Sequence, residues 1–233
     1  MSAGAIPGGS FADLSLFRGM SAPSRDDLLG AAVAHTVAAG ALLFEQGDAP
    51  TFQHVVISGS VQLFARSAAR RQVLIETVRP TDLIIPAAVV TNAPYLVRAL
   101  APEASRILLI HAAAFRAAVA GDADLARQVI GSLAGQFRRM VRQVKTLKLR
   151  PALERVGCHI LALSAQQGTP DRAVLPYEKK LIASELGITR ESFSRALGAL
   201  QGSGIVVHGD VIAIADRTRL AARCKPDPLV DGV

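Results

Sequence analysis

The chain has 233 residues, half of them hydrophobic, and its formal net charge is +7. This length suits two modest domains with cores of their own, and no apolar run approaches the roughly 20 residues that cross a bilayer. The two cysteines are too few for a disulfide framework and fit no zinc spacing. The first ten residues lack the features of a secretory signal, so we expect a cytoplasmic protein without membrane association.

The first half of the chain passes from a helical to a strand-like pattern. Residues 12–33 predict helical structure, with Ser24 as the cap of a helix that extends to Val33. Short β-favouring runs follow at 37–44, 51–57, 61–65, 72–78 and 105–110, separated by glycine or proline. Runs of this length and spacing predict a small antiparallel barrel or jelly roll, after which residues 110–120 are helical. Residues 11–121 are therefore the first predicted domain.

A single long helix is predicted over residues 122–149. Its apolar residues recur at alternating steps of three and four, which is an a/d seam: Ile130, Leu133, Phe137, Met140, Val144 and Leu147. A helix of about 28 residues is roughly 42 Å long, longer than a compact domain needs for itself. The seam predicts pairing with a second copy of the helix, the alternative being packing against the chain's own barrel. Arg150-Pro151 ends the helix, so residues 122–150 form a predicted dimerisation helix.

Residues 181–204 predict two short helices joined by a tight turn at Gly187, after a helix at 153–165 and a loop at 167–170. The apolar residues of each helix fall on one face, which leaves Arg190, Glu191, Ser194 and Arg195 on the outside of the second helix. Arg, Glu and Ser side chains can donate to or accept from base edges in a DNA major groove. A helix-turn-helix that reads sequence is predicted, with a plain solvated hairpin as the alternative.

The segment after the second helix predicts a wing. Residues 205–207 and 211–214 favour strands and flank a His208-Gly209-Asp210 turn, and residues 215–224 predict a closing helix. Residues 122–225 hold seventeen Lys and Arg against nine Asp and Glu, a charge excess that favours phosphate binding. Residues 151–224 therefore form a predicted winged helix-turn-helix, and the fold class is α+β. The predicted DNA-binding residues are Lys179, Lys180, Thr189, Arg190, Glu191, Ser192, Ser194, Arg195 and His208.

The order of barrel, seamed helix, helix-turn-helix and wing resembles the CRP/FNR family of bacterial transcription regulators over residues 11–224. The most specific matches are Glu-Gln-Gly-Asp at 45–48, Val-Val-Ile-Ser-Gly-Ser-Val-Gln-Leu at 55–63, and the recognition helix. The resemblance implies a homodimer, an N-terminal sensor barrel of cyclic-nucleotide-binding type, an inverted-repeat site on double-stranded DNA, and RNA polymerase as a partner.

Within the recognition helix, Glu191, Ser194 and Arg195 match the Glu-x-x-Ser-Arg pattern of the FNR-like branch, whose members read half-sites related to TTGAT. Arg190 is instead similar to the Arg-Glu pair of the CRP branch, which leaves the outer bases of the half-site open. The spacing of Glu191 and Arg195 also permits an ion pair within the helix.

The sensor domain departs from family members that bind cyclic AMP. Those proteins carry a Gly-Glu pair for the ribose and an arginine for the phosphate, and here the matching positions are Ile84-Ile85 and Tyr95. Arg98 lies out of register with the phosphate arginine. An effector pocket lined by Ile84, Ile85, Tyr95 and Arg98 would thus be mainly apolar, which predicts a degenerate cyclic-nucleotide site and a signal other than cyclic AMP.

The cofactor is left open between haem, an organic ligand and none. A haem would need one of His35, His54 and His111 as axial ligand, and each of these is expected to be structural. The four cysteines of an iron-sulfur sensor are absent, and no metal-ligand spacing is found. A cyclic-nucleotide- or haem-binding signalling module of the same architecture is the alternative function.

An enzyme is not expected. Cys158 and His159 are adjacent on a predicted helix, where neighbouring side chains point about 100° apart and cannot form a nucleophile-base pair.

Overall fold

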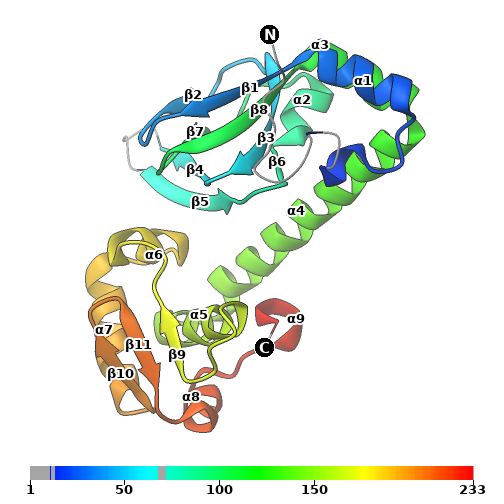
Figure 1. Cartoon of the computed structure of the whole chain (residues 1–233). Helices are drawn as coiled ribbons and strands as arrows, with labels where there is room; N and C mark the ends of the chain where they lie inside the picture. Colours follow the sequence, from blue (N-terminus) through cyan, green and yellow to red (C-terminus); the bar gives the residue numbers. More distant parts are fainter. Residues whose placement is uncertain (1–10, 12–13, 68–71, 233) are drawn as a thin grey trace. The chain divides into compact units, whose positions relative to one another are not determined.

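We analysed a computed structural model of the chain, which describes residues 11, 14–67 and 72–232 (Figure 1). The chain divides into two compact units, Met1–Phe137 and Arg138–Val233, and the division falls within the long helix α4 (Ala123–Leu149). The helices in the described part of the chain are too short or too polar to span a bilayer.

Two four-stranded antiparallel sheets form a jelly roll in the first unit, as predicted (Figure 1). One sheet has the order β1-β8-β3-β6, with strands Ala32–Val37, Ser105–His111, Phe52–Ser58 and Leu83–Ile84. The other has the order β2-β7-β4-β5, with strands Leu42–Phe44, Arg98–Leu100, Val61–Arg66 and Gln72–Val78. The two sheets stay separate, so the roll is not a closed barrel.

The interior of the roll is filled by side chains from both sheets. Its buried members are Phe44, Val56, Val61, Leu63, Val78, Ile84, Ala88, Tyr95, Ala99 and Ile107. The rings of Phe44 and Tyr95 stack at 3.7 Å between centroids, with an interplanar angle of 12°. Packing of this kind leaves apolar groups, and not charged ones, at the centre of the unit.

A second core covers the outer face of the β1-β8-β3-β6 sheet. Helices α1 (Ala22–Gly30) and α3 (Ala112–Gly121), the turn Ser15–Phe17 and the start of α4 contribute to it. Alternation along β3 explains why the sheet has two buried faces, because Val55 and Ile57 join this core while Val56 joins the interior of the roll. Leu125 and Val129 anchor the first turns of α4 here.

The turn between β3 and β4 requires glycine. Gly59 has φ +78°, and a Cβ at that position would lie 2.9 Å from Ser105 Cα. Ser60 N donates to Ser105 Oγ at 3.1 Å, which fixes the turn against β8. The family-like Ser-Gly-Ser motif is therefore explained by this close approach of two chain segments.

The second unit is a winged helix-turn-helix, as predicted. Its elements in chain order are α5 (Ala152–Gln166), β9 (Arg172–Val174), α6 (Lys179–Glu185), α7 (Arg190–Gln201), β10 (Ile205–His208), β11 (Val211–Ile214), α8 (Arg217–Cys224) and α9 (Pro228–Asp231). The three strands form one antiparallel sheet in the order β10-β11-β9. Ile160, Ile182, Phe193, Leu200 and Ile212 are fully or almost fully buried at its core.

The N-terminal elements differ from the sequence-based expectation. Helix α1 ends at Gly30, and residues 32–37 form a strand because they pair with β8 along their whole length. Ser21, and not Ser24, caps α1, since Ser24 N donates to Ser21 Oγ at 3.3 Å. Residues 12 and 13 of the predicted helix lie outside the described residues.

One further prediction needs correction. The predicted strand over residues 37–44 is interrupted at Gly40, which has φ +82° and turns the chain between β1 and β2. The predicted loop at 167–170 is present and leads into β9, a strand that was not predicted and whose Ala173 pairs with Ile212 of β11. Strand β9 arises from pairing between segments that are distant in the sequence, which overrides local propensity.

Candidate DNA-binding surface

The turn between α6 and α7 is fixed from both sides. Gly187 has φ +65°, and its N–H donates to Ser184 O at 3.0 Å. Ile188 N then donates to Ala183 O at 2.9 Å. On the α5 side, Arg155 Nη1 donates to Leu186 O at 2.7 Å. These contacts define how the recognition helix α7 leaves the turn.

Helix α7 begins with a side-chain cap. Thr189 is the N-cap residue, and its Oγ1 accepts a hydrogen bond from Ser192 N at 3.2 Å. The buried face of α7 consists of Phe193, Ala196, Leu197 and Leu200. Thr189 and Ser192 are therefore engaged at the start of the helix, with Thr189 exposed and Ser192 half-buried.

Arg190, Glu191, Ser194 and Arg195 are all exposed on α7. Arg195 Nη2 donates to Ser192 Oγ at 3.0 Å, so in this structure the arginine is held by the hydroxyl group one turn earlier. The pKa of Glu191 lies below its ordinary value because the carboxylate accepts hydrogen bonds, first from its own backbone N–H and then from the Thr189 side chain, and because Arg190 and Arg195 are close. An ionised Glu191 is an acceptor for base-edge amino groups.

The other three predicted DNA-binding residues come from α6 and from the wing. Lys179 and Lys180 are the first two residues of α6, the former half-buried and the latter exposed. His208 is the last residue of β10, pairs with Val211 across the wing turn, and is exposed. The predicted set is thus presented by three separate elements of the second unit.

The seam of α4 is largely uncovered. Phe137 is 65% exposed, and Ile130, Met140, Val144 and Leu147 are exposed as well. Leu133 is half-buried and packs against the outer core of the first unit. Val141 is a further exposed apolar residue of α4 that the seam pattern missed, although it lies one turn after Phe137.

The predicted effector residues lie in two environments. Ile84 and Tyr95 are buried inside the roll, and Tyr95 Oη donates to Phe52 O at 3.2 Å. Burial first, and then the charge of Asp48, raise the pKa of Tyr95 to about 12. Ile85 precedes α2 (Pro86–Thr91) with φ +44° and packs against the interior. Arg98, by contrast, is half-buried on β7, and its Nη2 lies 3.2 Å from Glu45 Oε1.

The three histidines of the first unit also differ in their surroundings. His35 and His111 are exposed on β1 and at the end of β8. His54 is buried beside Phe44 at 5.4 Å between ring centroids, and burial lowers its pKa to about 4. The described residues contain no group of three or more His, Cys, Asp and Glu side chains that could hold a metal ion.

Sequence reasoning missed the residues that support the helix-turn-helix from α4 and α5. Leu147 touches the turn at Gly187, and Arg155 bonds to Leu186 O. It also missed a polar network that joins α4 to the segment after α8. No local signal marks these contacts, because the partners lie more than 30 residues apart in the chain.

Comparison with known proteins agrees with this geometry. Residues 34–122 match the model of the cyclic nucleotide-binding domain, and residues 154–223 match the Crp-like helix-turn-helix domain. The CRP-like cAMP-activated global transcriptional regulator of Mycobacterium tuberculosis is 25% identical over 191 residues, which cover 80% of this chain and 85% of that protein.

Two solved structures are similar in fold. A structure from Silicibacter pomeroyi DSS-3, described as a cAMP-binding regulatory protein, is 27% identical, with a TM-score of 0.56 and coverage of 91% of this chain and 94% of that one. A structure from Eubacterium rectale ATCC 33656, assigned as a transcriptional regulator of the CRP/FNR family, is 18% identical, with a TM-score of 0.73 and coverage of 91% and 98%. The similarity to the E. rectale structure shows that the two chains share a fold.

A cyclic-nucleotide-binding domain followed by a Crp-like helix-turn-helix defines a class of DNA-binding transcription regulators and not of enzymes. The chain belongs to the CRP/FNR family, and it is a CRP-like transcriptional regulator with a helix-turn-helix DNA-binding domain.

Proposed function

We propose that the protein is a dimeric, sequence-specific regulator that binds inverted-repeat promoter sites with TTGAT-like half-sites, under control of a signal other than cyclic AMP. The observation that carries this proposal is the exposed polar face of α7, where Arg190, Glu191, Ser194 and Arg195 project from a capped helix. In this proposal, residues 11–121 sense the signal, residues 122–150 form the dimer and residues 151–224 bind DNA.

Base reading is assigned to Glu191 and Arg195. An arginine can donate a bidentate pair to guanine O6 and N7, and a carboxylate can accept from the cytosine amino group. Lys179, Lys180 and Arg190 stand at the starts of two helices, and together with His208 of the wing they suit contacts to phosphate. The division predicts that Arg195 gives specificity while Lys180 gives affinity alone.

Dimerisation is assigned to the exposed seam of α4. Phe137, Met140, Val141 and Val144 form a nearly continuous apolar stripe that this chain leaves open to solvent, and a stripe of this kind favours pairing with a second copy. A symmetric dimer would present two copies of α7, which matches the symmetry of an inverted repeat. RNA polymerase is proposed as the partner through which a promoter-bound dimer acts.

The proposal of a signal other than cyclic AMP is supported by the interior of the roll. The resemblance assigns Ile84 and Tyr95 to the positions of the family's ribose and phosphate groups, and in the structure both are buried among apolar residues. A nucleotide phosphate there would meet no guanidinium fork. The cyclic AMP activation described for the M. tuberculosis relative is a property of that protein.

The test is a titration of the protein with an inverted repeat of TTGAT-like half-sites and with a scrambled duplex, at several salt concentrations. Arg195→Ala should cost roughly 1–3 kcal/mol per half-site on the inverted repeat and little on the scrambled duplex. Lys180→Ala should weaken binding to both duplexes alike and reduce the salt slope by about one unit.

The two variants serve as each other's control because both remove one positive charge from the same unit. Equal losses on both duplexes for Arg195→Ala would mean that Arg195 contacts only phosphate, and reading by this face of α7 would then be abandoned.

A further inference from the structure

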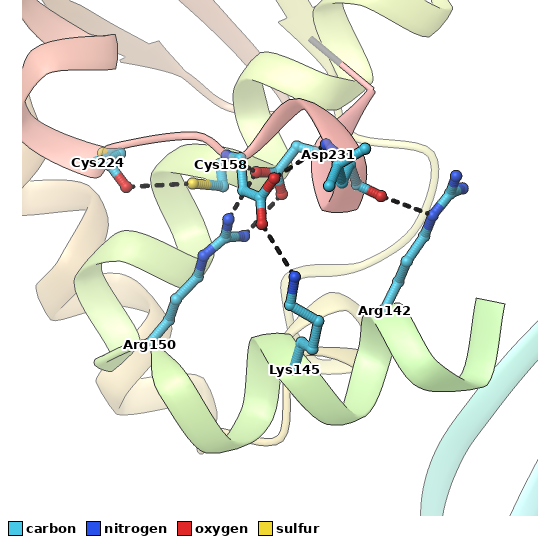
Figure 2. A network of polar contacts seen from close by, with 8 residues as sticks. Arg142, Lys145, Arg150, Cys158, Cys224 and Asp231 are labelled. Carbon is cyan, nitrogen blue, oxygen red and sulfur yellow. Dashed lines mark hydrogen bonds and ion pairs between the residues drawn. The ribbon is translucent and has the colours of Figure 1, made fainter. Parts of the chain in front are cut away.

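The segment that follows α8 is tied to the end of α4. This segment, residues 225–231 including α9, is called the strap below. Arg150 Nη1 and Nη2 each donate at 2.7 Å to one carboxylate oxygen of Asp231 (Figure 2). The two side chains are only 10% and 8% exposed. A bidentate, shielded pair of this kind fixes orientation as well as distance.

Two basic residues of α4 itself also contact the strap. Lys145 Nζ lies 3.0 Å from Asp227 Oδ2, and Arg142 Nε donates to Leu229 O at 3.1 Å. Within the strap, Asp227 N donates to Asp231 Oδ2 at 2.7 Å, so the two acidic residues are also connected to each other. The contacts of the strap with α4 and with Arg150 are therefore linked to each other through this hydrogen bond.

The strap acts at the junction between α4 and the DNA-binding domain. Arg150 stands between the last residue of α4 and Pro151, the N-cap of α5. The strap begins directly after Cys224, whose carbonyl oxygen accepts from Cys158 Sγ of α5 at 3.3 Å (Figure 2). After α8 the chain thus returns to the end of α4. The strap therefore contacts both sides of the junction between α4 and the DNA-binding domain.

The strap leaves the proposed dimer seam open. At about 100° of rotation per residue, Arg142 and Lys145 fall on a different side of α4 from Phe137 and Val144, which stay exposed. The strap also lies beyond residue 223, where the match to the Crp-like helix-turn-helix model ends.

We propose that Arg150 and Asp231 are positioning residues, and that the strap sets the direction in which the DNA-binding domain extends from α4. This inference rests on the proposed function, because in a dimer joined by α4 that direction determines the separation of the two recognition helices. The separation must match the spacing of half-sites on DNA, about one helical turn or a multiple of it. The strap therefore selects the spacer length of the inverted repeat.

The experiment compares the full-length protein with Asp231→Ala on a series of inverted repeats whose spacer changes by one base pair at a time. The unmodified protein should prefer one spacer, and the variant should bind that spacer roughly 2- to 30-fold more weakly with a flatter preference. Binding to a single half-site should be unchanged, because α7 and its supports are intact. Asp171→Ala removes an exposed carboxylate of the same unit and should keep the original preference.

A reciprocal variant, Arg150→Glu with Asp231→Arg, should restore part of the spacer preference if the ion pair is responsible. An unchanged preference in Asp231→Ala, or an equal loss on single half-sites, would overturn the positioning role. The latter outcome would instead indicate a damaged DNA-binding domain.

Hydrogen exchange separates this inference from the proposed function. Asp231→Ala should speed amide exchange at Arg150 and at residues 152–156 by roughly the same factor, whether or not DNA is bound. If the unmodified protein binds no inverted repeat, the proposed function fails and the positioning role fails with it, while faster exchange would still show that the strap holds the junction. Unchanged exchange would overturn the strap itself.

Discussion

Gly187, in the turn of the helix-turn-helix, lies against Leu147 of α4. A Cβ at residue 187 would come within 2.6 Å of Leu147 Cδ2, and the backbone there has φ +65°. The left-handed conformation favours glycine at this turn, and a larger residue would in addition require the Leu147 side chain to shift. The same leucine remains 39% exposed. It can therefore contact the turn and still take part in the proposed seam.

Gly187→Ala should destabilise the second unit by about 1–3 kcal/mol, because a residue with a Cβ is strained at φ +65° and the new methyl group displaces the Leu147 side chain. Urea denaturation measures this difference. Gly198→Ala is the matched control, since a Cβ at residue 198 of α7 has no atom within 4 Å. That change should stabilise the protein by about 0.5–1 kcal/mol, and equal effects for the two variants would contradict the proposed strain at Gly187.

Phe137→Glu combined with Val144→Glu should convert the dimer to monomers. The two changes place like charges across the proposed seam, where burial makes an unpaired carboxylate costly. Light scattering gives the molar mass, and DNA titration should show weaker binding to the inverted repeat. Arg138→Glu, which lies on another side of α4 and is exposed, should remain dimeric. A double variant that keeps the mass of a dimer would place the interface elsewhere.

The first unit should lose stability between pH 6.5 and about 4. Burial lowers the pKa of His54 from 6.5 to about 4, so in this window the unfolded chain binds a proton that the folded chain does not. The stability contributed above pH 6.5 is therefore lost as the pH falls, and the free energy of unfolding should be about 2 kcal/mol lower at pH 5 than at pH 7.

This loss can be followed by tyrosine fluorescence. The chain has no tryptophan and two tyrosines, so in a Tyr177→Phe background Tyr95 reports on the first unit alone. Introducing His54→Leu in that background should remove about 2 kcal/mol of the difference between pH 7 and pH 5. If the difference is the same with and without His54, the buried imidazole is not its cause.

Cyclic AMP should neither bind at physiological concentration nor change the affinity for DNA. Ile84 and Tyr95 are buried inside the roll, and these two side chains offer no carboxylate for a ribose and no cation for a phosphate. Isothermal calorimetry is the direct measurement. A saturable heat in the micromolar range would show that the nucleotide is accepted in some other way.

Long periodic elements could be predicted from the sequence because their information is local. The a/d seam of α4, the apolar stripe of α7 and the Gly-Asp turn of the wing each appear within one stretch of chain, and all three elements are present. Strand β1 could not be predicted in this way. Its six residues mix alanine with β-branched valine and threonine, so local propensity is ambiguous, and the pairing with β8 makes the segment a strand.

The candidate site shows the same limit. Helical spacing predicts the exposed face of α7, but it does not predict the partner of Arg195, because Ser192 and Glu191 are both about one turn away. In the structure the arginine donates to Ser192. The pair of Arg150 and Asp231 spans 81 residues. Nothing in either local sequence indicates such a partner, because a salt bridge leaves no periodic pattern.

The stacked rings of Phe44 and Tyr95 fill part of the interior of the roll with the protein's own side chains. Tyr95 is held at three points, since its hydroxyl donates to Phe52 O, its N–H donates to Asp48 O at 3.0 Å and its carbonyl accepts from Gly47 N at 2.8 Å. A small molecule that entered the roll at this place would have to displace the ring and release the loop at 47–48 in the same event. Ligand entry and loop opening would then be one equilibrium, and the affinity for such a molecule would include the free energy of displacing Tyr95 from its stack.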